Sequence, residues 1–146
     1  VFKLRSMKYN GSAQSSHADI RNASVTQPND QRITKVGRIL RRYRLDELPQ
    51  LANVLRGEMS LIGPRPEALA LAEWYENELP FYTYRHIIKP GLTGWAQVNQ
   101  GHVADIDAVH TKLQYDFYYI KYFSAWLDIL IVMRTIKTIF SGFGAK

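Results

Sequence analysis

The chain has 146 residues, of which 46% are hydrophobic, and this size and apolar content predict one compact domain. It contains no cysteine, which excludes disulfides and thiolate metal sites and suits a reducing cytoplasm. The net charge of +6 is uneven: ten Lys and Arg against two acids give residues 1–45 a charge of +8, whereas nine against eleven leave the remainder at −2. A positive lobe attracts nucleic acid, anionic lipid headgroups or nucleotide phosphates, and composition does not choose among these partners.

The first half of the chain predicts several short elements. Apolar and basic residues alternate over residues 1–9, which is typical of a short strand with one apolar face. Residues 10–30 are polar and rich in Ser and Asn, so they predict a mobile loop. Apolar residues at helical spacing among many arginines then predict a basic amphipathic helix over residues 32–42.

A second predicted helix starts at Asp46, a favourable N-cap, tolerates Pro49 in its first turn and ends at Gly57. Its expected buried face consists of Leu48, Leu51, Ala52 and Leu55. An extended segment is predicted over residues 59–66, followed by a helix over residues 68–75.

The C-terminal part begins with a Lys-Pro-Gly turn at residues 89–91, and residues 94–99 predict a strand or tight loop. Residues 107–140 are aromatic and helical, with a broad apolar surface made of Phe123, Trp126, Leu127, Leu130, Ile131, Met133, Ile136 and Phe140. Charged residues interrupt this surface, so we expect it to lie on a membrane and not to cross it. We find no signal peptide and no uncharged run of about eighteen residues, and expect no spanning helix.

These elements predict an α+β fold: a mainly helical compact domain with a few short strands and a C-terminal amphipathic membrane-surface helix. The four histidines have neither zinc-type spacing nor cysteine partners. No Walker loop and no G-x-G-x-x-G motif occurs. Any bound phosphate would therefore be held by side chains and a metal ion.

Asp46 and Glu47 form an adjacent carboxylate pair just after a run of arginines. An ordinary N-cap is the alternative interpretation of Asp46, and the two interpretations are compatible. A helix N-terminus keeps a carboxylate ionised, which favours a metal ligand or an anionic nucleophile. Glu47 lies about a quarter turn further round, so both carboxylates can approach one Mg²⁺ ion or one phosphate.

Arg65 stands between Pro64 and Pro66, which hold the backbone extended and present the guanidinium for bidentate phosphate binding. A solvated arginine in a rigid turn is the alternative. The run that contains Arg38, Arg41, Arg42 and Arg44 is either a solvated face or part of the same phosphate site.

Four segments occur in a fixed order: KLRSM at residues 3–7, LDELPQL at 45–51, MSLIGPRP at 59–66 and KPGLTGWAQVN at 89–99. Together they resemble the bacterial sugar transferase family, the monotopic polyprenyl-phosphate phosphoglycosyl transferases. The segment YDFYYI at residues 115–120 resembles the C-terminal part of that family, so the resemblance covers nearly the whole chain.

The resemblance implies transfer of a sugar-1-phosphate from a UDP-sugar to polyprenyl (undecaprenyl) phosphate, with Mg²⁺ as cofactor and UMP as product. It also implies that the protein acts at the cytoplasmic face of the inner membrane and performs the first membrane step of exopolysaccharide or lipopolysaccharide assembly. No nucleic acid partner is expected. By this analogy Asp46 is the nucleophile, forms a covalent phosphosugar intermediate and ligates the metal, while Glu47 supports metal binding or proton handling. The implied phosphate-binding residues are Lys3, Arg5, Arg41, Arg65 and Arg85.

Three departures from the family pattern bear on these expectations. The hydrophobic N-terminal segment that dips into the membrane is missing, so we expect residues 1–146 to be a single catalytic domain without it. Leu4 replaces the usual aromatic residue, and Gln-Gly-His at residues 100–102 replaces a Gly-Arg-Asn run, which bears on sugar choice. The rival interpretation is a non-catalytic membrane-surface or polyanion-binding module derived from this fold, with salt-sensitive binding that does not depend on Asp46.

Overall fold

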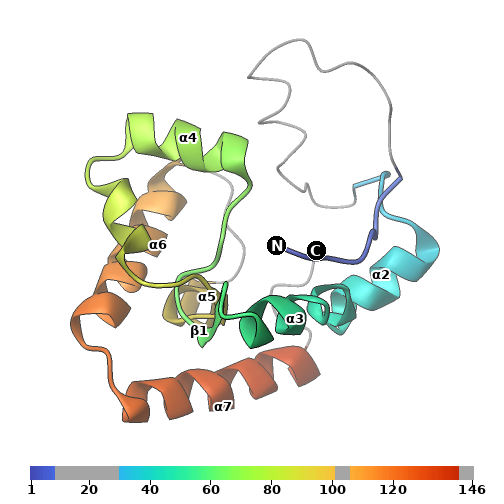
Figure 1. Cartoon of the computed structure of the whole chain (residues 1–146). Coiled ribbons are helices and arrows are strands. Elements are labelled where there is room, and N and C mark those ends of the chain that lie inside the picture. Colours follow the sequence, from blue (N-terminus) through green and yellow to red (C-terminus); the bar gives the residue numbers. More distant parts are fainter. Residues whose placement is uncertain (9–29, 101–105, 142–146) are drawn as a thin grey trace.

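The structure is a computed structural model of the chain and describes residues 1–8, 30–100 and 106–141 (Figure 1). These residues are mainly helical with two short strands, which confirms the predicted α+β class. Almost all of the loop predicted over residues 10–30 lies outside the described residues, as do Gly101 and His102 of the sugar-choice segment.

The N-terminal segment is extended but is not the strand that its alternating pattern predicts. Within the described residues it forms a single antiparallel bridge, between Met7 and Ile33. Its backbone is engaged elsewhere: the N–H of Leu4 donates to the carbonyl of Asp46 at 2.9 Å, and the N–H of Phe2 donates to Oδ1 of Asn53 at 2.9 Å. The segment is therefore held by the turn at Asp46, by the side chain of Asn53 and by the single bridge at Met7, and the prediction of a strand was wrong.

Helix α2 (Lys35–Arg42) confirms the predicted basic helix, and Thr34 caps it by accepting a hydrogen bond from the N–H of Gly37 at 2.9 Å. Gly37 is buried under the N-terminal segment, where an added Cβ would lie 2.0 Å from the carbonyl oxygen of Ser6. The close approach of these two segments thus requires glycine at this position.

The turn after α2 differs from the predicted cap. Asp46 lies inside a short 3₁₀ helix, η1 (Leu45–Glu47), which follows Arg44 in a left-handed conformation with φ of 54°. Pro49, not Asp46, occupies the N-cap position of α3 (Gln50–Leu55). The N-cap prediction was wrong because the chain makes an additional turn before the helix begins.

The predicted apolar face of α3 is also wrong. Leu48, Leu51 and Leu55 are exposed, whereas Gln50 and Asn53 are buried. The buried side meets the N-terminal segment, whose backbone N–H requires a polar acceptor such as Asn53.

The sheet consists of two parallel strands, β1 (Ser60–Ile62) and β2 (Gly91–Thr93), with Ser60 paired to Gly91. Helix α4 (Leu69–Glu78) and the 3₁₀ helix η2 (Tyr82–Ile87) connect them. The predicted extended segment and the helix after it are thus confirmed. The strand or loop predicted over residues 94–99 is wrong, because helix α5 (Trp95–Gln100) starts directly after β2.

Two long helices complete the fold, α6 (Ile106–Lys121) and α7 (Ala125–Ser141), and confirm the predicted helical C-terminal part. One apolar cluster joins α4, η2 and α6; a second contains Leu127 and Ile131 of α7, which are therefore core residues. In Figure 1, α4 lies at the top and α7 at the bottom. None of the helices that the structure describes has the length and apolar character needed to cross a membrane.

The close contact between the strands gives a first prediction. A Cβ at Gly91 would lie 2.1 Å from the backbone N of Gly63, so Gly91→Ala must force the strands apart. We expect this substitution to lower the free energy of unfolding by about 2 kcal/mol, measured by urea denaturation. Leu69→Ala, at an exposed position of α4, is the control and should change stability by less than about 0.5 kcal/mol. An unchanged unfolding midpoint for Gly91→Ala would contradict the tight strand pairing.

Candidate active site

The carboxylates of the site come from η1, where Asp46 and Glu47 are 3% and 8% exposed. The left-handed turn at Arg44 and the hydrogen bond from Leu4 to the Asp46 carbonyl fix this short helix against the N-terminal segment. Buried carboxylates are costly unless cations or hydrogen-bond donors compensate them. Both have such partners.

Lys3 is the cation shared by the pair. Its Nζ lies 3.2 Å from Oδ2 of Asp46 and 3.7 Å from Oε1 of Glu47, and its side chain is 40% exposed. The extended N-terminal segment, which crosses η1 at Leu4, brings this amine to the carboxylates. A partly exposed lysine beside two buried acids leaves one charge of the site open to solvent and to an anionic ligand.

Arg65 makes a two-pronged contact with Glu47. Its Nη1 donates to Oε2 at 3.2 Å, and its Nη2 donates to Oε1. Burial alone would raise the pKa of the Glu47 carboxyl, but the hydrogen bonds and charge of Arg65, helped by Lys3, hold that pKa below its ordinary value of 4.5. Glu47 is therefore ionised at neutral pH.

The other predicted basic residues are placed differently. Arg5 is exposed, and Arg41 is half-buried on α2, which contacts η1. Arg85 is buried and donates hydrogen bonds to Asp116, Tyr82 and the backbone carbonyl of Arg65. A phosphate contact from Arg85 stays a prediction. In the structure, its guanidinium binds other protein groups.

Two polar contacts were missed by sequence reasoning. Asp116 pairs with Arg85 at 2.8 Å, and Lys112 contacts the carboxylate of Glu67. Lys112 and Asp116 are four residues apart on α6 and so share one face of this helix. That spacing was visible in the sequence, but burial of the face was not.

The donor set of the site suits a metal ion only in part. Among the residues that the structure describes, no group of three or more His, Asp and Glu side chains could hold a metal ion. Mg²⁺ commonly uses one or two carboxylates together with substrate phosphates and water. The Asp46–Glu47 pair fits that mode, in which a bound diphosphate supplies the remaining oxygens.

Comparison with known proteins identifies the family. Residues 1–142 match the bacterial sugar transferase family. The chain belongs to this family. The resemblance carried by the four ordered segments is thus confirmed.

Three relatives from this family are named for different sugars. The chain is 51% identical over 146 residues to a UDP-N-acetylgalactosamine-undecaprenyl-phosphate N-acetylgalactosaminephosphotransferase of Aeromonas hydrophila, covering all of this chain and 33% of that protein. It is 45% identical over 148 residues to the UDP-glucose:undecaprenyl-phosphate glucose-1-phosphate transferase of Escherichia coli, and the match covers 100% of this chain and 30% of that protein. It is 44% identical over 117 residues to the undecaprenyl-phosphate galactose phosphotransferase of Salmonella typhimurium, and the match covers 80% of this chain and 23% of that protein. The chain thus spans about a third or less of these relatives.

The lowered pKa of Glu47 predicts a pH-dependent contribution to stability. A carboxyl whose pKa is lower in the folded state stabilises fully above its unfolded pKa, and this contribution is lost as pH falls through the folded pKa. We expect Glu47→Gln to lower the free energy of unfolding by about 2 kcal/mol at pH 7. The difference from wild type should shrink as pH falls below 4.5, measured by urea denaturation across pH. A difference that stays constant down to pH 3 would contradict a lowered pKa of Glu47 in the folded state.

Proposed function

We propose that this chain transfers a sugar-1-phosphate from a UDP-sugar to undecaprenyl phosphate and releases UMP. The observation that carries this proposal is its match, over its whole length, to the Aeromonas hydrophila and Escherichia coli transferases, whose names share undecaprenyl phosphate. The names differ in the sugar, which is N-acetylgalactosamine in one relative and glucose in the other. We therefore carry over the common reaction and leave the sugar to experiment.

We assign Asp46 as the nucleophile. Its carboxylate oxygen attacks the phosphorus that bears the sugar, the bond from this phosphorus to the bridging oxygen breaks, and UMP leaves with the electron pair. An oxygen of undecaprenyl phosphate then attacks the same phosphorus and releases the Asp46 carboxylate. The contacts of the pair support this choice. Both carboxylate oxygens of Glu47 accept hydrogen bonds from Arg65, whereas the ion pair of Asp46 with Lys3 uses its Oδ2.

The cations around the pair suit the diphosphate of the donor. Lys3 lies beside both carboxylates, and Arg65 offers a planar guanidinium that can bind phosphate oxygens in a bidentate manner. We assign Arg5 and Arg41 to the outer part of the same phosphate site. Mg²⁺, held by Asp46 with Glu47 beside it, would offset the negative charge of the diphosphate.

Exposed apolar side chains on α7 support docking on a membrane. The large exposed apolar side chains of this helix and the segment before it include Phe123, Trp126, Ile129, Val132, Met133, Ile136 and Phe140. Large exposed apolar patches mark interaction surfaces, and aromatic residues are favoured where water meets lipid. The patch supports docking on a membrane surface. Together with the proposed reaction, we assign the chain to the cytoplasmic face of the inner membrane and to the first membrane step of exopolysaccharide or lipopolysaccharide assembly.

The covalent step gives a prediction for Asp46→Asn. Intact-mass spectrometry of the chain with Mg²⁺ and each of three UDP-sugars (N-acetylgalactosamine, glucose and galactose) should detect one added sugar phosphate in the wild type. The adduct should be lost in Asp46→Asn, with at least about a thousandfold slower transfer. Stability should change by less than about 1 kcal/mol, because the ion pair with Lys3 is partly exposed.

Asp107→Asn, which makes the same change at an exposed aspartate of α6, is the matched control and should form the adduct normally. An adduct on Asp46→Asn at the wild-type rate would show that another group is the nucleophile. Salt-sensitive binding of UDP that is independent of Asp46, with no adduct from any donor, would favour the polyanion-binding module.

The membrane surface gives a separate prediction. Trp126 and Met133 lie two turns apart on α7 and are both exposed. We expect the double substitution Trp126→Ser and Met133→Ser to weaken binding to anionic phospholipid vesicles by about tenfold or more in a sedimentation assay. Leu69→Ser, an exposed site on α4 at the other end of the fold, should leave binding unchanged (Figure 1). Equal loss in both variants would mean that α7 is not the docking surface.

A further inference from the structure

Residues 64–67 carry the arginine that holds Glu47, and they lie outside any helix or strand. Three contacts fix their path. The carbonyl of Pro64 accepts from the N–H of Gly91 at 2.9 Å, the carbonyl of Arg65 accepts from Nη2 of Arg85 at 2.8 Å, and Glu67 contacts Nζ of Lys112. The conformation of this segment thus depends on side chains from other elements.

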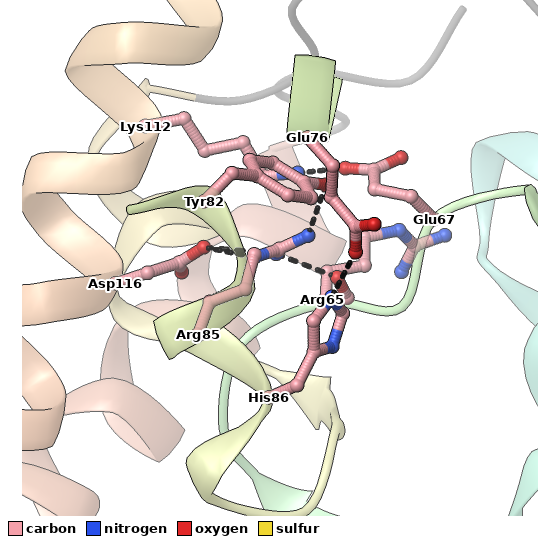
Figure 2. A network of polar contacts seen from close by, with 8 residues as sticks. All are labelled: Arg65, Glu67, Glu76, Tyr82, Arg85, His86, Lys112 and Asp116. Carbon is pink, nitrogen blue, oxygen red and sulfur yellow. Dashed lines mark hydrogen bonds and ion pairs between the residues drawn. The ribbon is translucent and has the colours of Figure 1, made fainter. Parts of the chain in front are cut away.

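Arg85 is the centre of the buried network that Figure 2 shows. Its Nε and Nη2 donate to Oδ2 of Asp116 at 3.1 and 2.8 Å, and its Nη1 donates to the hydroxyl of Tyr82 at 2.7 Å. Burial alone would lower the pKa of Arg85, but the charge of Asp116 raises it above the ordinary range, so the guanidinium stays charged. The hydrogen bond to the Arg65 carbonyl is therefore charge-assisted.

Helix α6 supplies both fixed ends of this network. Lys112 and Asp116 project from the same helix in Figure 2, one toward Glu67 and the other toward Arg85. Buried ion pairs seldom stabilise a fold more than well-packed apolar residues of similar volume. Stability alone is therefore a weak reason for two such pairs on one helix face. Their shared target is the segment that carries Arg65.

We propose that Asp116 and Lys112 are positioning residues for the transfer reaction: acting through Arg85 and Glu67, they fix residues 64–67 and so aim the guanidinium of Arg65 at the Asp46–Glu47 pair. The prolines on either side of Arg65 make this transmission effective, because they restrict the backbone dihedrals through which the segment could otherwise relax. This inference rests on the proposed function for its catalytic consequence. Its structural content, the orientation of Arg65, is independent of it.

A double-mutant cycle on turnover separates positioning from general destabilisation. Asp116→Asn keeps the side-chain size but removes the charge, and we expect it to lower kcat by about a hundredfold, the cost of misplacing a reacting group by about 1 Å. In an Arg65→Lys background, the same substitution should lower kcat by less than about threefold, because the residue that it positions is already lost. Equal effects in both backgrounds would overturn the proposal.

Two further variants test whether the loss of kcat comes from the network and not from lower stability. Val109→Ala removes buried apolar volume from the same helix but none of the hydrogen-bonding or charged groups of the network, so it should lower the melting temperature while leaving kcat unchanged below that temperature. Lys112→Gln breaks the more exposed of the two pairs and should lower kcat by about tenfold, again only when Arg65 is present. If Asp116→Asn does not fold, the Lys112→Gln cycle alone decides.

A spectroscopic readout tests the orientation of Arg65 without any transfer. In ¹⁵N-resolved NMR spectra of the arginine side chains, the two-pronged contact with Glu47 should slow rotation of the Arg65 guanidinium and give separate Nη signals. These signals should merge or broaden in Asp116→Asn and Lys112→Gln, and persist in Val109→Ala. Persistence in both network variants would refute the positioning role even if transfer is demonstrated. If the separate Nη signals are lost in the network variants while the wild type transfers no sugar phosphate, the positioning role is supported and the proposed function is rejected.

Discussion

The contact between Glu47 and Arg65 joins the two parts of the molecule that form the site. Glu47 belongs to the turn that the N-terminal segment and α2 hold, whereas Arg65 belongs to the segment after β1, eighteen residues further along. Each charge would be costly to bury alone, and their two-pronged contact compensates both. Through this contact, Lys3 and Asp46 are linked to the network on α6.

Charged residues are linked one to the next along a line through the molecule. Asp116 pairs with Arg85, Arg85 binds the backbone of Arg65, Arg65 pairs with Glu47, and Lys3 lies between Glu47 and Asp46. Asp116, Arg85, Glu47 and Asp46 are buried, Arg65 is half-buried, and Lys3 is partly exposed. The line is therefore rigid where it meets the core and adaptable where a diphosphate would approach. This arrangement suits preorganised electrostatic stabilisation, because the protein groups need little rearrangement when charge arrives.

Much of this site could be predicted from the sequence because its main residues lie in short ordered motifs, as Asp46, Glu47 and Arg65 do. Helix α2 was predicted from apolar spacing, and helices were also predicted where α4 and α6 lie. Periodicity identified apolar residues on α3 but not which side the fold covers, so its exposed leucines were predicted to be buried. Asp116 was missed because burial of a charged residue depends on a partner 31 residues away. Tertiary contacts, not local pattern, decide such positions.

The separation of Lys3 and Asp116 along the chain has a consequence for how this domain can be rearranged. The charges of the line extend from Lys3 to Asp116, so they span most of the sequence and no short segment contains them. A circular permutation that opens the chain between α6 and α7, at residues 122–124, would leave the stretch from Lys3 to Asp116 uninterrupted. A cut between β1 and α4 would instead separate Arg65 from its fixed path. A rearranged form of this domain therefore has to keep the residues from Lys3 to Asp116 in their order.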